Sequence, residues 1–151
     1  MLLRIPVPWV FILAYLLGLG LQRLLPHLSF PPGARHFLHV AGIVLWLLAV
    51  LIAGSALFLF YRRRNTTTPG EISRTLVLDG PYRLSRNPMY VGLVLAYIGE
   101  MCCQAQIMPL ITLVLTVAYL QGAVIPLEES RLGATFGESY AQYRSCVRRW
   151  L

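Results

Sequence analysis

The sequence FLHVAGIVLWLLAVLIAGSALFLFY, residues 37–61, decides the class of fold. It carries no formal charge apart from a possible one on His39. A transmembrane helix needs about 20 mainly apolar residues, so this stretch predicts a membrane span. Of the 151 residues, 57% are hydrophobic and 13% are charged, and the mean hydropathy is +0.64. An ordinary soluble domain carries about 25% charged residues, so the composition excludes that class.

Three further apolar stretches occupy residues 8–25, 88–108 and 109–127. The first follows Arg4 and could be a signal peptide, but the bulky residues 21–25 offer no small-residue cleavage site. We therefore expect four spans. The predicted fold is all-α, a polytopic membrane helical bundle of about four transmembrane helices plus a C-terminal interfacial helix.

The length fits a single domain at residues 1–151. We expect it to be an integral membrane domain, and its predicted parts follow from the four spans. They are two N-terminal spans (1–61), a cytoplasmic connector (62–87), a transmembrane hairpin (88–127) and a cytoplasmic amphipathic tail (128–151).

All 13 basic residues are arginine, and the net charge is +7. In a soluble protein this charge would suggest nucleic acid. Here the arginines lie between or after apolar stretches, so the membrane surface explains them better, and we expect no nucleic-acid partner. Four spans put Arg23 and Arg35 on one side. The other side holds Arg4, Arg62, Arg63, Arg64, Arg74, Arg83, Arg86, Arg131, Arg144, Arg148 and Arg149.

This asymmetry predicts the orientation of the chain. Cytoplasmic loops carry an excess of arginine and lysine, so both termini and both polar segments are expected in the cytoplasm. In a bacterium the membrane would be the inner one. The lipid bilayer is therefore an expected partner, whereas nothing in the sequence indicates the oligomeric state.

The first polar motif, GPYRLSRNPMYVG, occupies residues 80–92. Asn87 is a favoured N-cap residue and Pro88 suits the first helical position, so a helix is predicted to begin there. A helix N-terminus favours anions, and Arg83 and Arg86 add positive charge beside it. The alternative is a capped helix whose arginines contact lipid phosphates.

The second motif begins with Glu128 and Glu129 at the end of the fourth stretch. Two acids at a membrane boundary are costly unless solvated or paired. Adjacent helical side chains point about 100° apart, so one is expected to face the bundle and the other water. A glutamate facing Arg86 or a bound cation would be functional, and a solvated helix end or an ion pair is the alternative.

The tail repeats large apolar and aromatic residues at helical spacing, which predicts one face of an amphipathic helix on the membrane. Gly133 and Gly137 weaken that helix, so a bend is expected. This face would also cover whatever lies beside Glu128. Its members are Leu132, Phe136, Tyr140 and Tyr143.

The order of the motifs resembles a known family. It reads LVxxGPYRxxRNPMYxG from residue 76, then an apolar hairpin, then EExxLxxxFGxxYxxY from residue 128. This is similar to the isoprenylcysteine carboxyl methyltransferase family, in a bacterial-type form. It also resembles the wider group of membrane methyltransferases that includes phospholipid N-methyltransferases. The resemblance covers roughly residues 74–151.

The resemblance implies S-adenosyl-L-methionine as cofactor, bound at the cytosolic end of the hairpin. It implies catalytic roles for Arg86, Glu128 and Tyr90. Two positions depart from the eukaryotic pattern: Asn87 replaces a histidine, and Val124 replaces an arginine that contacts substrate. The implied cofactor-binding residues are Arg74, Thr75, Leu76, Val77, Tyr82, Asn87, Pro88, Met89, Tyr90 and Glu128.

The residue chemistry agrees with this cofactor. The helix start and Arg86 suit its carboxylate, and Glu128 suits its ammonium. Tyr82 and Tyr90 could face the sulfonium or the adenine. Methyl transfer needs alignment and desolvation more than acid–base work. Asn87 cannot act as a base near neutral pH, but a carboxylate acceptor would need none.

We therefore expect methyl transfer to a lipophilic small-molecule or lipidated acceptor with a carboxylate, amine or thiol, at the cytoplasmic membrane face. The alternatives are an NADPH-linked membrane reductase of the sterol-reductase-like type and a non-catalytic membrane scaffold. No metal site is expected, because the histidines and cysteines lack ligand spacing. Glu100, near the outer end of its span, is expected to reach the headgroups rather than share this chemistry.

Overall fold

The computed structural model describes residues 6–26, 30–62 and 75–151. Within these ranges the chain forms helices and no strand, as the sequence predicts. Four residues discussed above lie outside the described ranges: Arg4, Arg63, Arg64 and Arg74.

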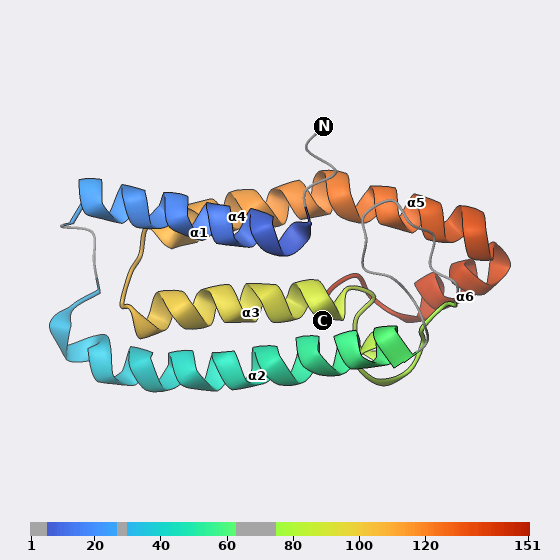
Figure 1. The fold of residues 1–151 in the computed structure, drawn as a ribbon, viewed down its shortest axis with the longest axis horizontal. Coiled ribbons are helices and arrows are strands. Elements are labelled where there is room, and N and C mark those ends of the chain that lie inside the picture. Colours follow the sequence, from blue (N-terminus) through green and yellow to red (C-terminus); the bar gives the residue numbers. More distant parts are fainter. Residues whose placement is uncertain (1–5, 27–29, 63–74) are drawn as a thin grey trace.

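Four long helical segments, here called rods, form the bundle (Figure 1). They are α1, α2, α3 and the continuous run of α4, η4 and α5, which is the last rod. In Figure 1, α1 lies beside α4, and α2 lies beside α3. A short helix, α6, follows the last rod, and two 3-10 turns precede α2 and α3. The elements are α1 (Val7–Leu24), η2 (Pro32–Ala34), α2 (Arg35–Arg62), η3 (Gly80–Arg83), α3 (Pro88–Cys103), α4 (Pro109–Tyr119), η4 (Leu120–Val124), α5 (Ile125–Phe136) and α6 (Glu138–Cys146).

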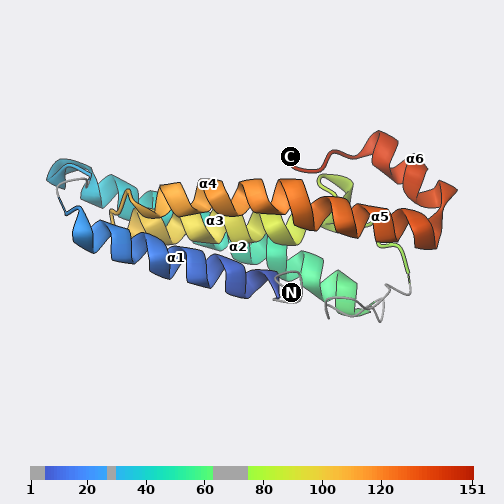
Figure 2. The ribbon, with the colours of Figure 1, turned by 90° about the horizontal axis from the view of Figure 1, so that it is seen from above.

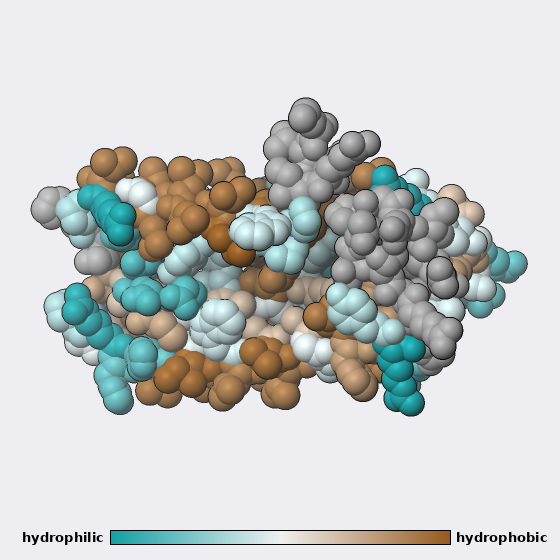
Figure 3. All heavy atoms as spheres, in the orientation of Figure 1, coloured by the Kyte–Doolittle hydropathy of each residue, from teal (hydrophilic) through white to brown (hydrophobic). Residues whose placement is uncertain are grey.

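Three segments of the described chain are long and apolar enough to cross a membrane: Val7–Leu24, Pro32–Arg62 and Pro109–Phe136. Helix α3 is apolar but has 16 residues, about 24 Å, which is shorter than a typical hydrocarbon core of about 30 Å. Within the described ranges, three of the four expected spans have this length, and the fourth, α3, is an apolar but shorter helix packed among them. Figure 3 shows hydrophobic side chains along the rods and the most hydrophilic ones gathered toward the two ends. Such a surface suits lipid, and the chain is an integral membrane protein.

Helix α3 ends earlier than the predicted residue 108 because the chain turns after Cys103. Ala105 takes a positive φ of 51°, which a helix cannot accommodate. The Gln22 side chain of α1 then accepts hydrogen bonds from the backbone N–H groups of Ile107 and Met108, both at 3.0 Å. These bonds satisfy donors at the start of the next rod.

The last rod extends beyond the predicted end at residue 127. Helices α4, η4 and α5 follow without a break from Pro109 to Phe136. Pro126 lacks the N–H that a regular helix would use, and the π-helical turn η4 lies directly before it. The wider turn lets the helix pass the proline, so Glu128 and Glu129 lie within a helix rather than at its end.

The predicted amphipathic helix of the tail is divided between two helices, α5 and α6. Gly137, with a φ of 53°, ends α5 and starts α6, so the expected bend occurs there. Leu132 and Phe136 belong to α5, whereas Tyr140 and Tyr143 belong to α6. Figure 2 shows α6 turning back from the end of α5.

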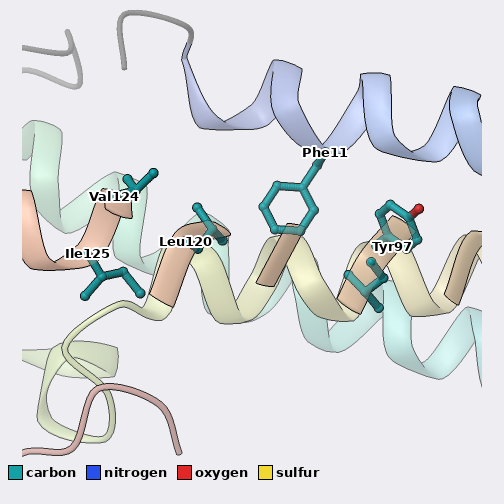
Figure 4. Close-up of a cluster of buried hydrophobic side chains, with 6 residues drawn as sticks. Phe11, Tyr97, Leu120, Val124 and Ile125 are labelled. Atoms are coloured by element: carbon teal, nitrogen blue, oxygen red, sulfur yellow. The ribbon is translucent and has the colours of Figure 1, made fainter. Parts of the chain in front are cut away.

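Small residues allow α2 and α3 to approach closely. A Cβ on Gly42 would lie 2.6 Å from the carbonyl oxygen of Gly99, and a Cβ on Gly99 would lie 3.1 Å from Trp46. Such contacts are the usual basis of helix packing in membranes. A core cluster joins α1, α3 and the last rod (Figure 4). It contains Phe11, Tyr97, Leu113, Leu120, Val124 and Ile125.

Candidate active site

Both polar motifs lie at one end of the bundle. Figure 1 places the end of α2, the start of α3, and helices α5 and α6 together there. Glu100 lies toward the opposite end of α3 and accepts hydrogen bonds from Trp46 and Gln104, at 3.3 and 3.1 Å. It is therefore separate from the motifs, as expected, and its carboxylate is held by neighbouring side chains. No group of metal-ligating residues occurs within the described ranges.

The Gly80–Arg83 turn buries the ring of Tyr82. Gly80 adopts a φ of 59°, which favours glycine, and the turn places Tyr82 against Ala56 of α2 and Val77. The Tyr82 backbone carbonyl accepts a hydrogen bond of 2.7 Å from the Tyr143 hydroxyl of α6. The turn is thereby held between α2 and α6.

Two of these tyrosines have raised pKa values. Burial raises the pKa of Tyr82, and nearby Tyr143 and Glu128 raise it further. Burial also raises the pKa of Tyr143 to about 12. The Tyr82 hydroxyl is buried, with no hydrogen-bond partner in the described part of the chain. A buried hydroxyl of this kind is usually bonded, so it is a candidate ligand contact.

Asn87 occupies the N-cap position of α3, but its side chain does not cap the helix. Its amide instead donates to the carbonyl oxygen of Arg149 at 3.0 Å. Its backbone N–H donates to the Ser85 hydroxyl at 3.1 Å. The expected capping role is wrong, because the Asn87 amide is bonded to the C-terminal segment instead. The first turn of α3 therefore has no side-chain cap.

Glu129 and two arginines form a buried ion-pair network. Glu129 is 8% exposed and Arg86 10% exposed, and their Oε1 and Nη2 atoms lie 3.0 Å apart. Arg149 binds the same carboxylate in two places, with Nε 3.0 Å from Oε1 and Nη2 2.6 Å from Oε2. The glutamate facing Arg86 is therefore Glu129, in an ion pair. The Nε atom of Arg86 is buried and has no hydrogen-bond partner among the described residues.

Glu128 also faces the protein, so the expectation that one acid of the pair points to water is wrong. It is half-buried, and its Oε1 accepts a hydrogen bond of 2.6 Å from the Tyr90 hydroxyl of α3. The cause is the continuation of α5, which packs both acids against neighbours rather than ending before them. Tyr90 and Glu128, predicted together, are thus in direct contact.

The remaining predicted residues surround this contact less closely. Val77 is buried and Leu76 half-buried, and Thr75 is exposed. Pro88 is fully buried at the start of α3, and Met89 packs against the Tyr82 cluster. Arg74 lies outside the described residues. Val77, Tyr82 and Met89 therefore share one cluster, while Tyr90 contacts Glu128.

The sequence pattern did not indicate the contacts that the C-terminal segment, residues 147–151, makes with the loop before α3. The carbonyl of Arg148 accepts from the Arg86 backbone N–H at 2.9 Å, and the carbonyl of Arg149 accepts from the Ser85 hydroxyl at 3.0 Å. Trp150 donates to Gln121 at 2.9 Å and packs against the core cluster. The available signal is a tryptophan directly after two arginines. This pattern is also typical of residues at a membrane surface.

A groove of about 490 Å³ lies between α5 and α6. Glycines 133 and 137 line it, together with the charged groups of Glu129, Arg144 and Arg149. Because the two arginines outnumber the one acid, the groove is positively charged.

Comparison with known proteins gives one match. The sequence model of the phospholipid methyltransferase family matches residues 37–139, which run from α2 into α6 and include the first polar motif and the paired glutamates of the second. No curated protein and no solved structure matches the chain. The matched region covers most of the chain, with α3, the last rod and nearly all of α2, and leaves out α1. The chain therefore belongs to the phospholipid methyltransferase family and is a membrane methyltransferase.

Proposed function

We propose that the chain transfers a methyl group from S-adenosyl-L-methionine to a lipophilic or amphipathic acceptor at the cytoplasmic face. The observation that carries this proposal is the contact of Tyr90 with Glu128 beside the unpartnered hydroxyl of Tyr82. The cofactor supplies an activated methyl group when bound. Its ammonium and carboxylate require an acid and a cationic or N–H-rich partner within one site.

The residues present fit these requirements. Glu128 has a neutral phenol as its hydrogen-bond partner, so its negative charge is available to an ammonium group. The uncapped start of α3 and the positive groups nearby favour a carboxylate. The ring of Tyr82 and its hydroxyl, which has no partner among the described residues, together with Tyr90 supply a surface for a sulfonium or adenine. Thr75, Leu76, Val77, Pro88 and Met89 would complete this surface.

The chemistry assigned to the protein is alignment and exclusion of water. Arg86, Glu128 and Tyr90 are the proposed catalytic residues, acting through charge and position. Asn87 needs no imidazole function here, because its amide holds the C-terminal segment. We further propose the bacterial-type isoprenylcysteine carboxyl methyltransferase branch, supported by the RNPMY and paired-glutamate motifs. A carboxylate acceptor in that branch would react without a base.

Calorimetry on the full chain in detergent tests cofactor binding. The parent is expected to bind S-adenosyl-L-methionine, and Glu128→Gln to bind at least about tenfold more weakly because one charge-assisted contact is lost. Glu138→Gln, an exposed acid of α6, is the matched control and should bind like the parent. A parent protein that binds neither this cofactor nor its demethylated product contradicts the proposal, whereas binding of NADPH would favour the reductase alternative.

A labelling experiment tests transfer and its acceptor. Membranes containing the chain are incubated with methyl-labelled cofactor, and the lipid extract and protein fraction are counted separately. Label in the lipid extract that disappears with Glu128→Gln supports a lipophilic acceptor. Label in neither fraction, with a cofactor-binding protein, contradicts the proposed acceptor class.

Native cysteines test the proposed orientation. Cys146 ends α6 and is exposed at the motif end, whereas Cys103 ends α3 at the opposite end. A membrane-impermeant maleimide should therefore label Cys146 in inverted membrane vesicles and leave it unlabelled in intact cells. Cys103→Ser removes the competing thiol. Labelling of Cys146 from outside intact cells would reverse the orientation and contradict a cytoplasmic site.

A further inference from the structure

The C-terminal segment, residues 147–151, forms a strap across the start of α3. It leaves α6 in extended conformation at Val147 and passes the loop that leads into α3. Its two consecutive carbonyls, of Arg148 and Arg149, accept three hydrogen bonds from that loop. The donors are the Arg86 backbone N–H, the Ser85 hydroxyl and the Asn87 amide.

Two adjacent side chains of the strap, Arg149 and Trp150, contact different parts of the protein. Trp150 donates to Gln121 of the last rod and packs against the core cluster. Arg149 points the other way, onto Glu129, and makes the two-point contact described above. Hydrogen bonding to Glu129 raises the pKa of Arg149, which keeps its guanidinium charged. These two side-chain contacts anchor the strap in addition to the three hydrogen bonds to its carbonyls.

We propose that Arg149 is a positioning residue for the cofactor site, acting through Glu129 and the strap. The Glu129 carboxylate is shared by two guanidiniums, and its other partner is Arg86. If Arg149 is removed, Arg86 becomes the only described ion-pair partner of that acid and can move toward it. The strap carbonyls of residues 148 and 149, which accept hydrogen bonds from Ser85, Arg86 and Asn87, are then no longer held by the ion pair. Both changes displace residues beside Tyr90 and Glu128.

The effect on binding follows from that displacement. A contact to a charged group is worth about tenfold or more in affinity, and displacing the group weakens that contact. We therefore expect Arg149→Ala to weaken S-adenosyl-L-methionine binding at least about tenfold. Arg149→Lys keeps the charge but cannot make the two-point contact, so it should recover part of the loss. This inference rests on the proposed function for its binding readout, but docking of the strap does not depend on it.

Fluorescence of Trp150 measures strap docking without cofactor. The chain has three tryptophans, so the substitutions Trp9→Phe and Trp46→Phe leave Trp150 alone. In this background Arg149→Ala should increase acrylamide quenching of Trp150, whereas Arg148→Ala should not. The Arg148 control removes an exposed guanidinium from the same strap and keeps its backbone carbonyl. Both variants are compared with the background by circular dichroism, which reports loss of the fold.

Three results separate the possible failures. Unchanged quenching in a folded Arg149→Ala protein overturns the anchoring role. Increased quenching with unchanged cofactor affinity overturns the positioning role. Increased quenching together with weaker binding, partly restored by Arg149→Lys, supports the proposal. If the background protein itself binds no cofactor, the proposed function fails, while the quenching comparison still decides whether Arg149 anchors the strap.

Discussion

Replacing Glu129 tests the ion-pair network most directly. Glu129→Gln keeps the size of the side chain but removes the charge that Arg86 and Arg149 share. Breaking a fully buried ion pair costs about 3–5 kcal/mol, because the remaining charge is left without a partner. Arg86 is 10% exposed and Arg149 26% exposed, so solvent reaches the second more easily. We therefore expect the lower end, about 3 kcal/mol.

Thermal unfolding in a fixed detergent measures this loss. For a chain of this length, about 1 kcal/mol corresponds to about 2–4 °C, so the midpoint should fall by about 6–12 °C. Glu138→Gln is the matched control, since it removes an exposed acid from the first turn of α6. Its effect should stay below about 1 kcal/mol, the range of a helix-dipole contribution. Equal midpoints for the two variants would refute the argument that Glu129 neutralises a buried pair of arginines.

Three further changes have distinct expected outcomes. Tyr90→Phe removes the hydroxyl that donates to Glu128. Calorimetry should show cofactor binding weakened by about tenfold, which is the contribution of a charge-assisted hydrogen bond. Unchanged binding would contradict a role for this contact. Gly99→Leu should prevent close packing of α2 on α3 and abolish the folded peak in size-exclusion chromatography, whereas Gly54→Leu, which meets no neighbour, should not. Tyr143 has a pKa raised from 10.0 to about 12 by burial, so its contribution to stability is complete below pH 10 and is lost as the pH rises through 12. When unfolding is measured between pH 10 and 12, the Tyr143→Phe variant should therefore lose less stability than the parent. Parallel curves of stability against pH for the two proteins would contradict the raised pKa of Tyr143.

The helical class could be predicted because apolar length alone specifies it. Residues 37–61 predict a span, and the structure extends that helix by only a few residues, to Arg35–Arg62. The start of α3 at Pro88 was also predictable, since a proline at the first position needs no N–H partner. The ends of helices were harder. Local sequence did not reveal that Gln22, far away in the chain, would provide hydrogen bonds at the start of α4.

The sequence named the polar residues that lie near one another but not most of their partners. The family resemblance placed Tyr90 and Glu128 in one predicted site, and the two are in contact because their helices meet at one end of the bundle. It did not reveal that Asn87 would bind the C-terminal strap. Such a contact depends on where a segment about 60 residues later returns, and the hydrogen bond of 3.0 Å forms only in the folded chain. Periodicity carries no information of that kind.

The two adjacent glutamates have different partners, and this difference favours Glu128 as the ligand-binding acid. Glu129 is 8% exposed and already contacts two guanidiniums, so little of its charge remains for another cation. Glu128 is bonded to the phenol of Tyr90, which carries no charge near neutral pH. A half-buried carboxylate with a neutral partner gains more from an arriving ammonium group than one that is already paired. The helical rotation of about 100° between neighbouring residues thus places Glu129 in the ion pair and leaves Glu128 for the proposed cofactor.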